Sequence, residues 1–321
     1  MSALLFTLAC GDPIAAPLPD PSVEERRQVA AEPESAPIAN VPVVRFIAMG
    51  DGGVGNETQY AVAKAVQSVC AERGCDFVLY LGDNIYNDGV NGVDDPQFQT
   101  KFEQPYAGLD LIFHMVLGNH DYGELSLAES KAEFEVAYSE KSTKWSMPAR
   151  HYTFAQEHVQ FYALDTNQIM VWDRPEQQAW LERERAASKA DWHIAFGHHP
   201  YISNGQHGNA GEYEGSPYIP IASGKSMKSF MDASICGQMQ LYLSGHDHNR
   251  QWLETQCGTH FIVSGAAAKT NGLVGRETPT HFEDDQKAGF LWVEIEGNTL
   301  TGVFYDQDAS VDYESSFTRG T

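Results

Sequence analysis

The chain has 321 residues, of which 42% are hydrophobic, and a formal net charge of -23 at pH 7. No apolar run reaches the ~18 to 20 residues that a membrane-spanning helix needs, so the composition predicts a soluble globular protein that is at most anchored. Proteins that bind nucleic acids or anionic membrane surfaces usually do so through patches of Lys and Arg, and the sequence contains no such patch. We therefore expect no nucleic-acid partner. An anionic substrate would have to be held by a multivalent metal cluster instead of surface lysines.

The first ten residues, MSALLFTLAC, form a short apolar segment that ends in small residues and Cys10. This segment is similar to the end of a bacterial lipoprotein signal, in which Cys10 would carry the lipid anchor. Residues 11–42 are rich in Pro, Ala and Glu and predict a disordered tether, and residues 43–321 predict a single catalytic domain. We expect an exported protein, either periplasmic or on the outer surface of a bacterium. An ordinary secretory signal or a disordered tail is the alternative.

Short apolar runs bounded by turn-forming residues predict buried strands, and segments with helical periodicity lie between them. The predicted strands are 43–49, 77–81, 111–117, 152–154, 159–164, 192–196, 239–243 and 260–263. The predicted helices are 57–72, 95–102, 126–138 and 175–188. This alternation is typical of an α/β layered fold. Residues 289–294 and 299–305 predict a hairpin that closes a sheet edge, and 204–220 predict a long loop beside a strand end, where functional residues often lie.

Four cysteines remain when Cys10 is set aside. Cys70 and Cys75 lie close together at the junction between a predicted helix and a predicted strand. Cys236 and Cys257 precede two predicted strands that would bring them together if those strands are neighbours. Of the three pairings that four cysteines allow, we favour these two bridges, which predict an oxidising compartment. The alternative is a set of four reduced, buried thiols in a cytosolic enzyme.

Several predicted strands end at a glycine that is followed directly by polar side chains. The residues of this set that could bind a metal are Asp51, Asp83, Tyr86, Asn119, His198, His246 and His248. A lone histidine or an Asp after Gly usually has a simpler explanation, but the carboxyl ends of strands in an open α/β sheet share one crevice. Glycine removes a Cβ where the backbone must pass close to a ligand. Oxygen donors combined with imidazoles suit Fe, Mn or Zn, and one bridging carboxylate would complete a two-metal site.

Five motifs follow one another along the chain: GDGG at 50–53, GDNIY at 82–86, GNHD at 118–121, GHHP at 197–200 and GHDH at 245–248. They resemble the five blocks of the metallophosphoesterases, and the GDxxY form of the second block is similar to that of the purple acid phosphatases. Shorter matches, such as LDT at 164–166 and VSGA at 263–266, resemble the small, tartrate-resistant type. The resemblance implies an α/β fold, a four-layer αββα sandwich with mixed β-sheets.

The resemblance also implies a binuclear metal centre. An Fe(III) would be held by Asp51, Asp83, Tyr86 and His248. A divalent Fe, Zn or Mn would be held by Asp83, Asn119, His198 and His246, so that Asp83 bridges the two ions. An unperturbed Tyr has a pKa of ~10, so ionising Tyr86 at neutral pH requires a trivalent ion beside it.

The activity that the resemblance implies is that of a phosphomonoesterase, an acid phosphatase in which a metal-bound hydroxide attacks a small phosphorylated substrate in line. His120 and His207 lie at family positions near the substrate, and one of them is expected to protonate the leaving oxygen or to hydrogen-bond a phosphoryl oxygen. Asn84 and Asp121 are expected to orient metal ligands.

The sequence also departs from the family. Mammalian members carry a long regulatory loop after LDT, but only residues 167–174 precede the next predicted helix, so we expect no inhibition by such a loop. His199 and Gly52 stand where those enzymes have Tyr and Trp, which leaves the substrate open. A phosphodiesterase or nucleotide hydrolase of the same fold is one alternative. A non-catalytic, iron-binding surface lipoprotein is another, although every ligand position and His120 are filled by competent residues.

Overall fold

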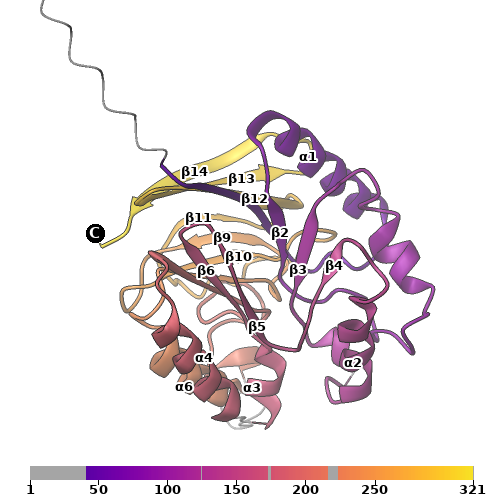
Figure 1. Cartoon of the computed structure of the whole chain (residues 1–321), viewed down its shortest axis with the longest axis horizontal. Helices are drawn as coiled ribbons and strands as arrows, with labels where there is room; N and C mark the ends of the chain where they lie inside the picture. Colours follow the sequence, from indigo (N-terminus) through magenta and orange to yellow (C-terminus); the bar gives the residue numbers. More distant parts are fainter. Residues whose placement is uncertain (1–40, 124, 173–174, 216–222, 321) are drawn as a thin grey trace, which may run out of the picture. The chain divides into compact units, whose positions relative to one another are not determined.

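Two mixed β-sheets, each of seven strands, pack face to face in the computed structural model (Figure 1). The structure describes residues 41–123, 125–172, 175–215 and 223–320, so the signal-like segment, the tether and Cys10 lie outside the described residues. The first sheet has the order β14 (Val311–Thr318), β13 (Thr299–Asp306), β12 (Gly289–Glu296), β1 (Val43–Met49), β2 (Phe77–Tyr80), β3 (Ile112–Met115) and β4 (Trp145–Ser146). The second has the order β11 (Thr280–Asp284), β9 (Arg250–Leu253), β10 (His260–Ser264), β8 (Leu241–Ser244), β7 (Trp192–Phe196), β6 (Val159–Ala163) and β5 (Tyr152–Gln156).

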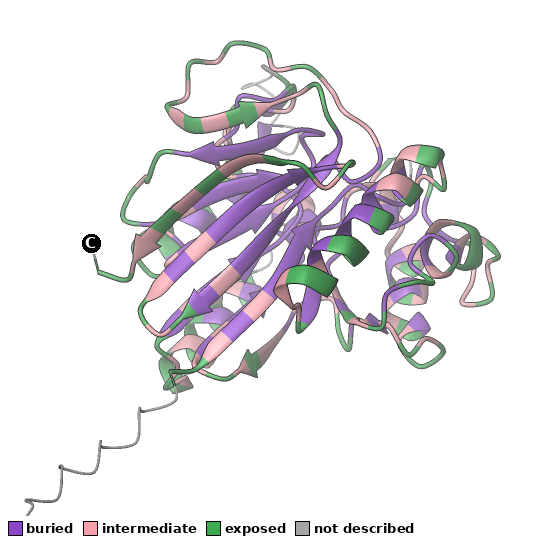
Figure 2. Ribbon diagram, turned by 90° about the horizontal axis from the view of Figure 1, so that it is seen from above, coloured by how far each residue is buried: buried purple, intermediate pink, exposed green. Residues whose placement is uncertain are grey.

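Aromatic side chains form the contact between the two sheets. Phe46 of β1 packs edge-on against Phe161 of β6, with ring centroids 5.4 Å apart. Phe77 of β2 meets Phe161 at 5.3 Å and Phe154 of β5 at 5.6 Å. Strands covered on both faces can be apolar throughout, which explains the continuous hydrophobic runs of the sequence. β1, β2 and β6 are buried over most of their length. In Figure 2 the central strands are mostly coloured as buried, whereas the helices keep exposed faces.

Helices cover the outer faces of the sheets. α1 (Glu57–Arg73) packs against β12 and β13 of the first sheet. It begins where the Asn56 side chain accepts a hydrogen bond from the backbone of Gln59, and it ends at Gly74, whose φ is +81°. α3 (Thr166–Trp172), α4 (Pro175–Ala187) and α6 (Lys225–Ser234) lie beside the second sheet, and α2 (Glu129–Tyr138) follows the His120 turn (Figure 1). The predicted αββα arrangement is therefore confirmed.

Some sequence-based elements were placed wrongly. The hairpin of β12 and β13 does not close a sheet edge, because β13 also pairs with β14 and β12 with β1. β14 was not predicted because its side chains are largely polar and half-exposed, as is usual for an edge strand. β9 was not predicted because it begins with two polar residues, Arg250 and Gln251. Both are buried, and the Arg250 guanidinium is neutralised by Asp284 and Asp312, each at 2.7 Å.

Both predicted disulfides form. Cys70 and Cys75 are joined at the junction between α1 and β2, with their Cα atoms 5.1 Å apart. Cys236 and Cys257 are joined with a Cα separation of 5.2 Å, because β8 and β10 are parallel neighbours, as the sequence argument required. Among the helices that the structure describes, none is long and apolar enough to cross a membrane.

Candidate metal centre

The seven side chains predicted to bind metal come from the carboxyl ends of strands in both sheets. β1, β2 and β3 are parallel neighbours, so Asp51, Asp83 and Asn119, which follow them, emerge at one edge of the first sheet. β7 and β8 are parallel neighbours in the second sheet and are followed by His198 and by His246. Because the sheets pack face to face, these two edges meet, and the structure brings all seven side chains together.

The backbone at this edge is strained. Asp51, Asp83 and His246 have φ values of +62°, +51° and +68°. A residue with a Cβ pays roughly 1 to 2 kcal/mol for the left-handed region, and such strain is concentrated at functional sites. The packing is also close: a Cβ on Gly118 would collide with the Asp83 carboxylate, and one on Gly245 would collide with the Asp51 carboxylate. The predicted close approach at these glycines is therefore confirmed.

One group of ligand atoms surrounds the Tyr86 hydroxyl. This hydroxyl donates to Asp51 Oδ1 at 2.9 Å and lies 3.0 Å from His248 Nε2. The same Asp51 oxygen is 3.4 Å from His248 Nε2. An oxygen of Asp83 lies within 4.8 Å of ligand atoms of Asp51 and His248. These atoms belong to the residues for which the family resemblance implied Fe(III) binding.

A second group surrounds His198 Nε2. This nitrogen lies 3.0 Å from Asn119 Oδ1, 3.0 Å from His246 Nδ1 and 3.4 Å from Asp83 Oδ1. The other ring nitrogen of His198 is 2.9 Å from the carbonyl oxygen of Leu81, to which it donates. That bond selects the tautomer whose Nε2 lone pair points into the group, as metal-binding histidines require. Asp83 belongs to both groups and so lies where a bridging ligand must.

The spacing of these atoms fits bound metal ions. Ligands at ~2.1 Å from an octahedral ion are separated by about 3 Å along each edge of the octahedron. Six separations within the two groups run from 2.9 Å to 3.4 Å, and the Asp83 oxygen of the first group lies within 4.8 Å of its neighbours. In addition, two imidazole nitrogens that face each other at 3.0 Å need a cation or a proton between them. The donor set therefore fits two ions that share Asp83.

The charges at the site favour metal over protons. Burial raises the pKa of the Tyr86 phenol far above its ordinary value, and the charges of Asp51 and Asp83 raise it further. Burial alone would raise the pKa of Asp83 as well, but His198 and His120 outweigh it and lower that pKa to about 2. Asp83 is thus an anion, and Tyr86 stays a neutral phenol until a multivalent cation stabilises the phenolate.

His120 lies beside the Tyr86 end of the site. Its ring centroid is 4.7 Å from that of Tyr86, and its Nδ1 is 2.6 Å from the carbonyl oxygen of Asn87. Its backbone N–H donates to Asp83 Oδ1 at 2.9 Å. The structure thus places His120 next to the first group of ligands.

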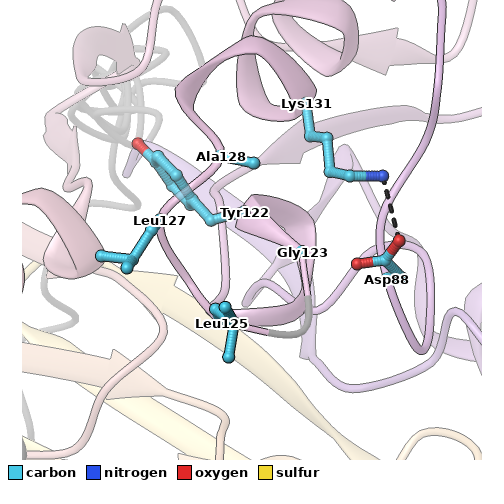
Figure 3. A pocket seen from close by; sticks show the side chains of 7 residues that line it. All are labelled: Asp88, Tyr122, Gly123, Leu125, Leu127, Ala128 and Lys131. Atoms are coloured by element: carbon cyan, nitrogen blue, oxygen red, sulfur yellow. Dashed lines mark ion pairs between the residues drawn. The ribbon is translucent and has the colours of Figure 1, made fainter.

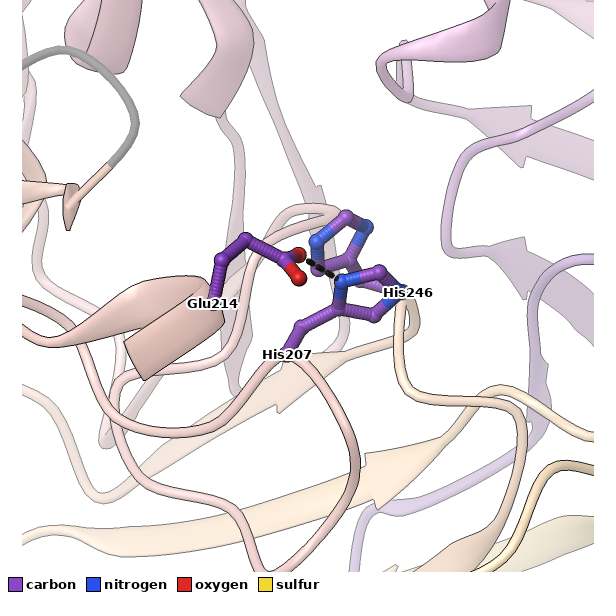
Figure 4. A group of neighbouring side chains, drawn as sticks. All are labelled: His207, Glu214 and His246. Atoms are coloured by element: carbon purple, nitrogen blue, oxygen red, sulfur yellow. Dashed lines mark hydrogen bonds and ion pairs between the residues drawn. The ribbon is translucent and has the colours of Figure 1, made fainter. Parts of the chain in front are cut away.

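His207 lies beside the other end of the site (Figure 4). Its ring stacks on that of His246 with centroids 3.9 Å apart, and its Nδ1 pairs with the carboxylate of Glu214. Its backbone N–H donates to Asp247 Oδ1 at 2.8 Å. Glu214 belongs to the predicted long loop, in a short 3-10 helix (Tyr213–Gly215). The sequence analysis missed it because no motif surrounds it.

Lys269 and Asn271 are two further neighbours that the sequence analysis missed. They lie in the stretch after the VSGA match, which carries no recognisable pattern of its own. The Lys269 ammonium nitrogen lies 3.6 Å from the centre of the Tyr86 ring. The Asn271 side-chain amide contacts His248 Nδ1 at 2.9 Å.

Asp121 and Asn84 form buried hydrogen bonds with the turns that carry the proposed ligands. Asp121 accepts hydrogen bonds from the backbone N–H groups of Gly118 and Asn84, both at 2.8 Å. The Asn84 amide in turn donates to Glu135 Oε2 at 2.9 Å. Burial, followed by the charge of Asp83, raises the pKa of Asp121 to about 7. Burial and the neighbouring Asp121 raise the pKa of Glu135 well above its ordinary value.

The raised pKa values of Asp121 and Glu135 predict that these two groups lower the stability of the metal-free protein as pH rises from about 4 to about 7, whereas buried histidines with lowered pKa values, such as His114 and His199, act in the opposite direction. Above pH ~4 the unfolded chain releases the protons of Asp121 and Glu135, whereas the folded chain keeps them, so at these two groups the folded state binds more protons. Glu135→Gln should remove the contribution of Glu135 and so make the slope of the unfolding free energy against pH more positive by up to about 1.4 kcal/mol per pH unit, because the amide is neutral throughout. Urea unfolding of the metal-free protein from pH 4 to 7 measures it. Glu140→Gln, an exposed control, should keep the wild-type slope, and a Glu135 variant that also kept it would contradict the argument.

A hollow of about 420 Å³ lies on the segment that follows His120 (Figure 3). It is lined by Asp88, Tyr122, Gly123, Leu125, Leu127, Ala128 and Lys131. Lys131 pairs with Asp88 at 3.2 Å, and Leu125 and Leu127 are 80% and 54% exposed. None of the proposed metal ligands lines this hollow, so it is not part of the metal centre.

Residues 44–250 match the calcineurin-like phosphoesterase family. The chain therefore belongs to this family, and it is a hydrolase acting on phosphoric ester bonds with a binuclear metal site. Its relatives are tartrate-resistant and purple acid phosphatases, as the sequence motifs predicted. Tartrate-resistant acid phosphatase type 5 of Oryctolagus cuniculus is 31% identical over 83% of this chain and 88% of its own length. Purple acid phosphatase 4 of Arabidopsis thaliana is 29% identical over 86% of this chain and 85% of its own length.

Solved structures agree with this fold. The purple acid phosphatase PPD1 from yellow lupin seeds superposes with a TM-score of 0.66 and 17% identity, covering 87% of this chain and 54% of that chain. GAP50, the anchor in the inner membrane complex of Plasmodium, superposes with a TM-score of 0.69 and 21% identity, covering 86% of this chain and 89% of that chain. At such identities the likeness establishes the fold alone.

Proposed function

We propose that the protein is an acid phosphatase of the purple type, which hydrolyses small phosphate monoesters at a centre of one Fe(III) and one divalent Fe, Zn or Mn ion. The observation that carries this proposal is the arrangement of two ligand groups that share Asp83, one of which contains a buried phenol. A phenolate is a hard anion that favours a trivalent ion, so Tyr86 distinguishes this centre from a site with two divalent ions. The family match favours an enzyme over a non-catalytic iron-binding protein.

The ligands are assigned by group. We propose that Fe(III) is bound by Asp51, Asp83, Tyr86 and His248, and that the divalent ion is bound by Asp83, Asn119, His198 and His246. Bound there, the two ions would supply a nucleophile derived from water and would neutralise charge on the phosphoryl group. Around them, Leu81 fixes the tautomer of His198.

We assign the handling of the leaving group to His120 and His207. Each ring is held through Nδ1, His120 by the carbonyl oxygen of Asn87 and His207 by the carboxylate of Glu214. The Nε2 atom of each ring therefore faces away from that partner, and in the imidazolium form it would donate a hydrogen bond to a phosphoryl oxygen or a proton to the leaving oxygen. The two rings flank the ligand groups at opposite ends, so a substrate bound across both ions would meet both.

We further propose that the protein is exported. Two disulfides support this, because such bridges persist in oxidising compartments. In this proposal residues 1–10 are the end of a signal, Cys10 carries a lipid anchor, residues 11–42 are the tether and residues 43–321 are the catalytic domain. The result would be a periplasmic or surface lipoprotein.

The hollow lined by Tyr122 and Gly123, which follow His120 in the chain, favours a second candidate, a phosphodiesterase or nucleotide hydrolase, because a hollow on this segment would hold the second ester group of a larger substrate. Assays at acidic pH with p-nitrophenyl phosphate and bis-p-nitrophenyl phosphate decide between them. We expect the monoester to have a kcat/KM at least ~10-fold higher, a difference of about 1.4 kcal/mol in transition-state binding.

Metal analysis on the same sample should find two ions per chain, one of them iron. Protein stripped of metal with a chelator is the control. A higher kcat/KM for the diester would favour the second candidate, and two bound metals without turnover of either ester would favour a binding protein.

A further inference from the structure

The loop that follows β10 is fastened to the Tyr86 end of the metal centre. On one side, the Asn56 amide donates to the carbonyl oxygen of Ala268 at 2.9 Å. On the other side, the Asn271 backbone N–H donates to the carbonyl oxygen of His248 at 2.8 Å, and the Asn271 side chain contacts His248 Nδ1 at 2.9 Å. Lys269 lies between these two attachments, so its position relative to the ligands is set by the fold.

Lys269 places its ammonium over the ring of Tyr86. The nitrogen is 3.6 Å from the ring centre, whereas the other cation–ring distances given for the described residues run from 4.9 Å to 5.9 Å. Asp51 and Asp83 also attract this ammonium. A cation over a neutral phenol contributes ~0.5 to 2 kcal/mol. Over a phenolate, the same cation faces a full negative charge in a half-buried site, and the attraction is stronger.

We propose that Lys269 is a positioning residue that tunes the metal centre through Tyr86. This inference rests on the proposed binding of Fe(III) by Tyr86. A positive charge over the ring stabilises the filled orbitals of the phenolate, so more energy is needed to move an electron from the ring to the iron. The same charge favours Fe(II) over Fe(III), because the reduced centre carries one positive charge fewer.

The consequence for catalysis is a more electrophilic centre. A phenolate held by Lys269 donates less density to the iron, which leaves the ion a better Lewis acid toward the phosphoryl group. The ammonium also adds one positive charge at the site of a chain whose net charge is -23, where an anionic substrate must approach. The chain thereby offsets part of its own repulsion toward phosphate.

Lys269→Met and Lys269→Arg test this proposal in the iron-loaded full chain. Met reproduces the unbranched Lys side chain as far as Cε and removes the charged nitrogen, so the visible absorption band should move to longer wavelength and the Fe(III)/Fe(II) reduction potential should fall. Arg keeps the charge and should keep both close to the wild-type values. Lys228→Met is the matched control, because Lys228 lies 5.6 Å from the Tyr201 ring and pairs with Asp232, among residues outside the metal centre. It should change neither quantity.

The outcomes separate this inference from the proposed function. A wild-type protein that is iron-loaded but lacks the band overturns the binding of Fe(III) by Tyr86. If the absorption band of Lys269→Met stays at the wild-type wavelength, only the proposed role of Lys269 is overturned. If the band is unmoved but Lys269→Met binds phosphate more weakly, the ammonium contacts the substrate instead of tuning the iron. If Lys269→Met does not load iron, Lys269→Gln provides a second neutral variant, which must shift the band in the same direction for the proposal to hold.

Discussion

Asp83→Ala is expected to lose both metal ions and to lower kcat/KM on the order of 10³-fold or more, because the proposed centre has no other ligand common to the two ions. Asp83 Oδ1 lies 3.4 Å from His198 Nε2, and an Asp83 oxygen lies within 4.8 Å of ligand atoms of Asp51 and His248. Without this carboxylate, each ion also feels the charge of its neighbour unscreened. Metal content and kcat/KM for p-nitrophenyl phosphate, measured on the same preparation, check the prediction.

Two further variants separate loss of metal from loss of fold. Asp83 has a φ of +51°, a region that Ala adopts poorly, so circular dichroism must accompany the assays. Asp83→Asn keeps the shape and removes the charge, and it should lose metal as well. Asp94→Ala removes an equal charge from a side chain that is 84% exposed, and it should bind two ions. An Asp83 variant with two metals and most of its turnover would exclude the bridging assignment.

The iron-loaded protein is expected to be pink to purple, and Tyr86→Phe is expected to abolish that colour. Charge transfer from a phenolate to Fe(III) absorbs visible light, and the Tyr86 hydroxyl, which lies 2.9 Å from Asp51 Oδ1 and 3.0 Å from His248 Nε2, supplies the phenolate in our assignment. Some hydrolysis should survive, because the phenol is not the source of the nucleophile. The visible spectrum and the rate of hydrolysis, recorded together, measure both effects.

Tyr80→Phe is the control for this prediction. Tyr80 is also buried, and its hydroxyl contacts that of Tyr106 at 3.2 Å, so the substitution removes a buried hydroxyl without touching the proposed ligands. It should leave the colour unchanged. A colourless protein that is replete with iron, or a Tyr86→Phe variant that keeps its colour, would make a Mn or Zn phosphoesterase the better assignment.

The sequence alone was sufficient for the α/β class, the five motifs and the convergence of the seven side chains proposed as ligands. Each signal is local: an apolar run ends at Gly and is followed at once by a polar group, as at Asp51 and Asp83. Parallel pairing then places such positions at one sheet edge, whatever the remaining details of the fold. The disulfides were predictable for a related reason, since each pair lies close to a recognisable strand or helix boundary. The hairpin of β12 and β13 shows the limit, because its hydrogen-bonded ladder is local while its place within the sheet depends on β1 and β14.

Only the tertiary structure decided which residues surround the ligands. Glu135 reaches Asn84 from α2, Glu214 reaches His207 from within a long loop, and Lys269 reaches Tyr86 from the segment after β10. In each case one partner lies outside every motif. A single Lys or Glu forms no sequence pattern, so its contact with a distant residue cannot be predicted from the sequence. These contacts arise where the edges of two sheets meet, and that meeting depends on the packing of Phe46 and Phe77 against Phe161. The proposed ligands can thus be recognised from short stretches of chain, whereas the electrostatic environment around them depends on the assembled fold.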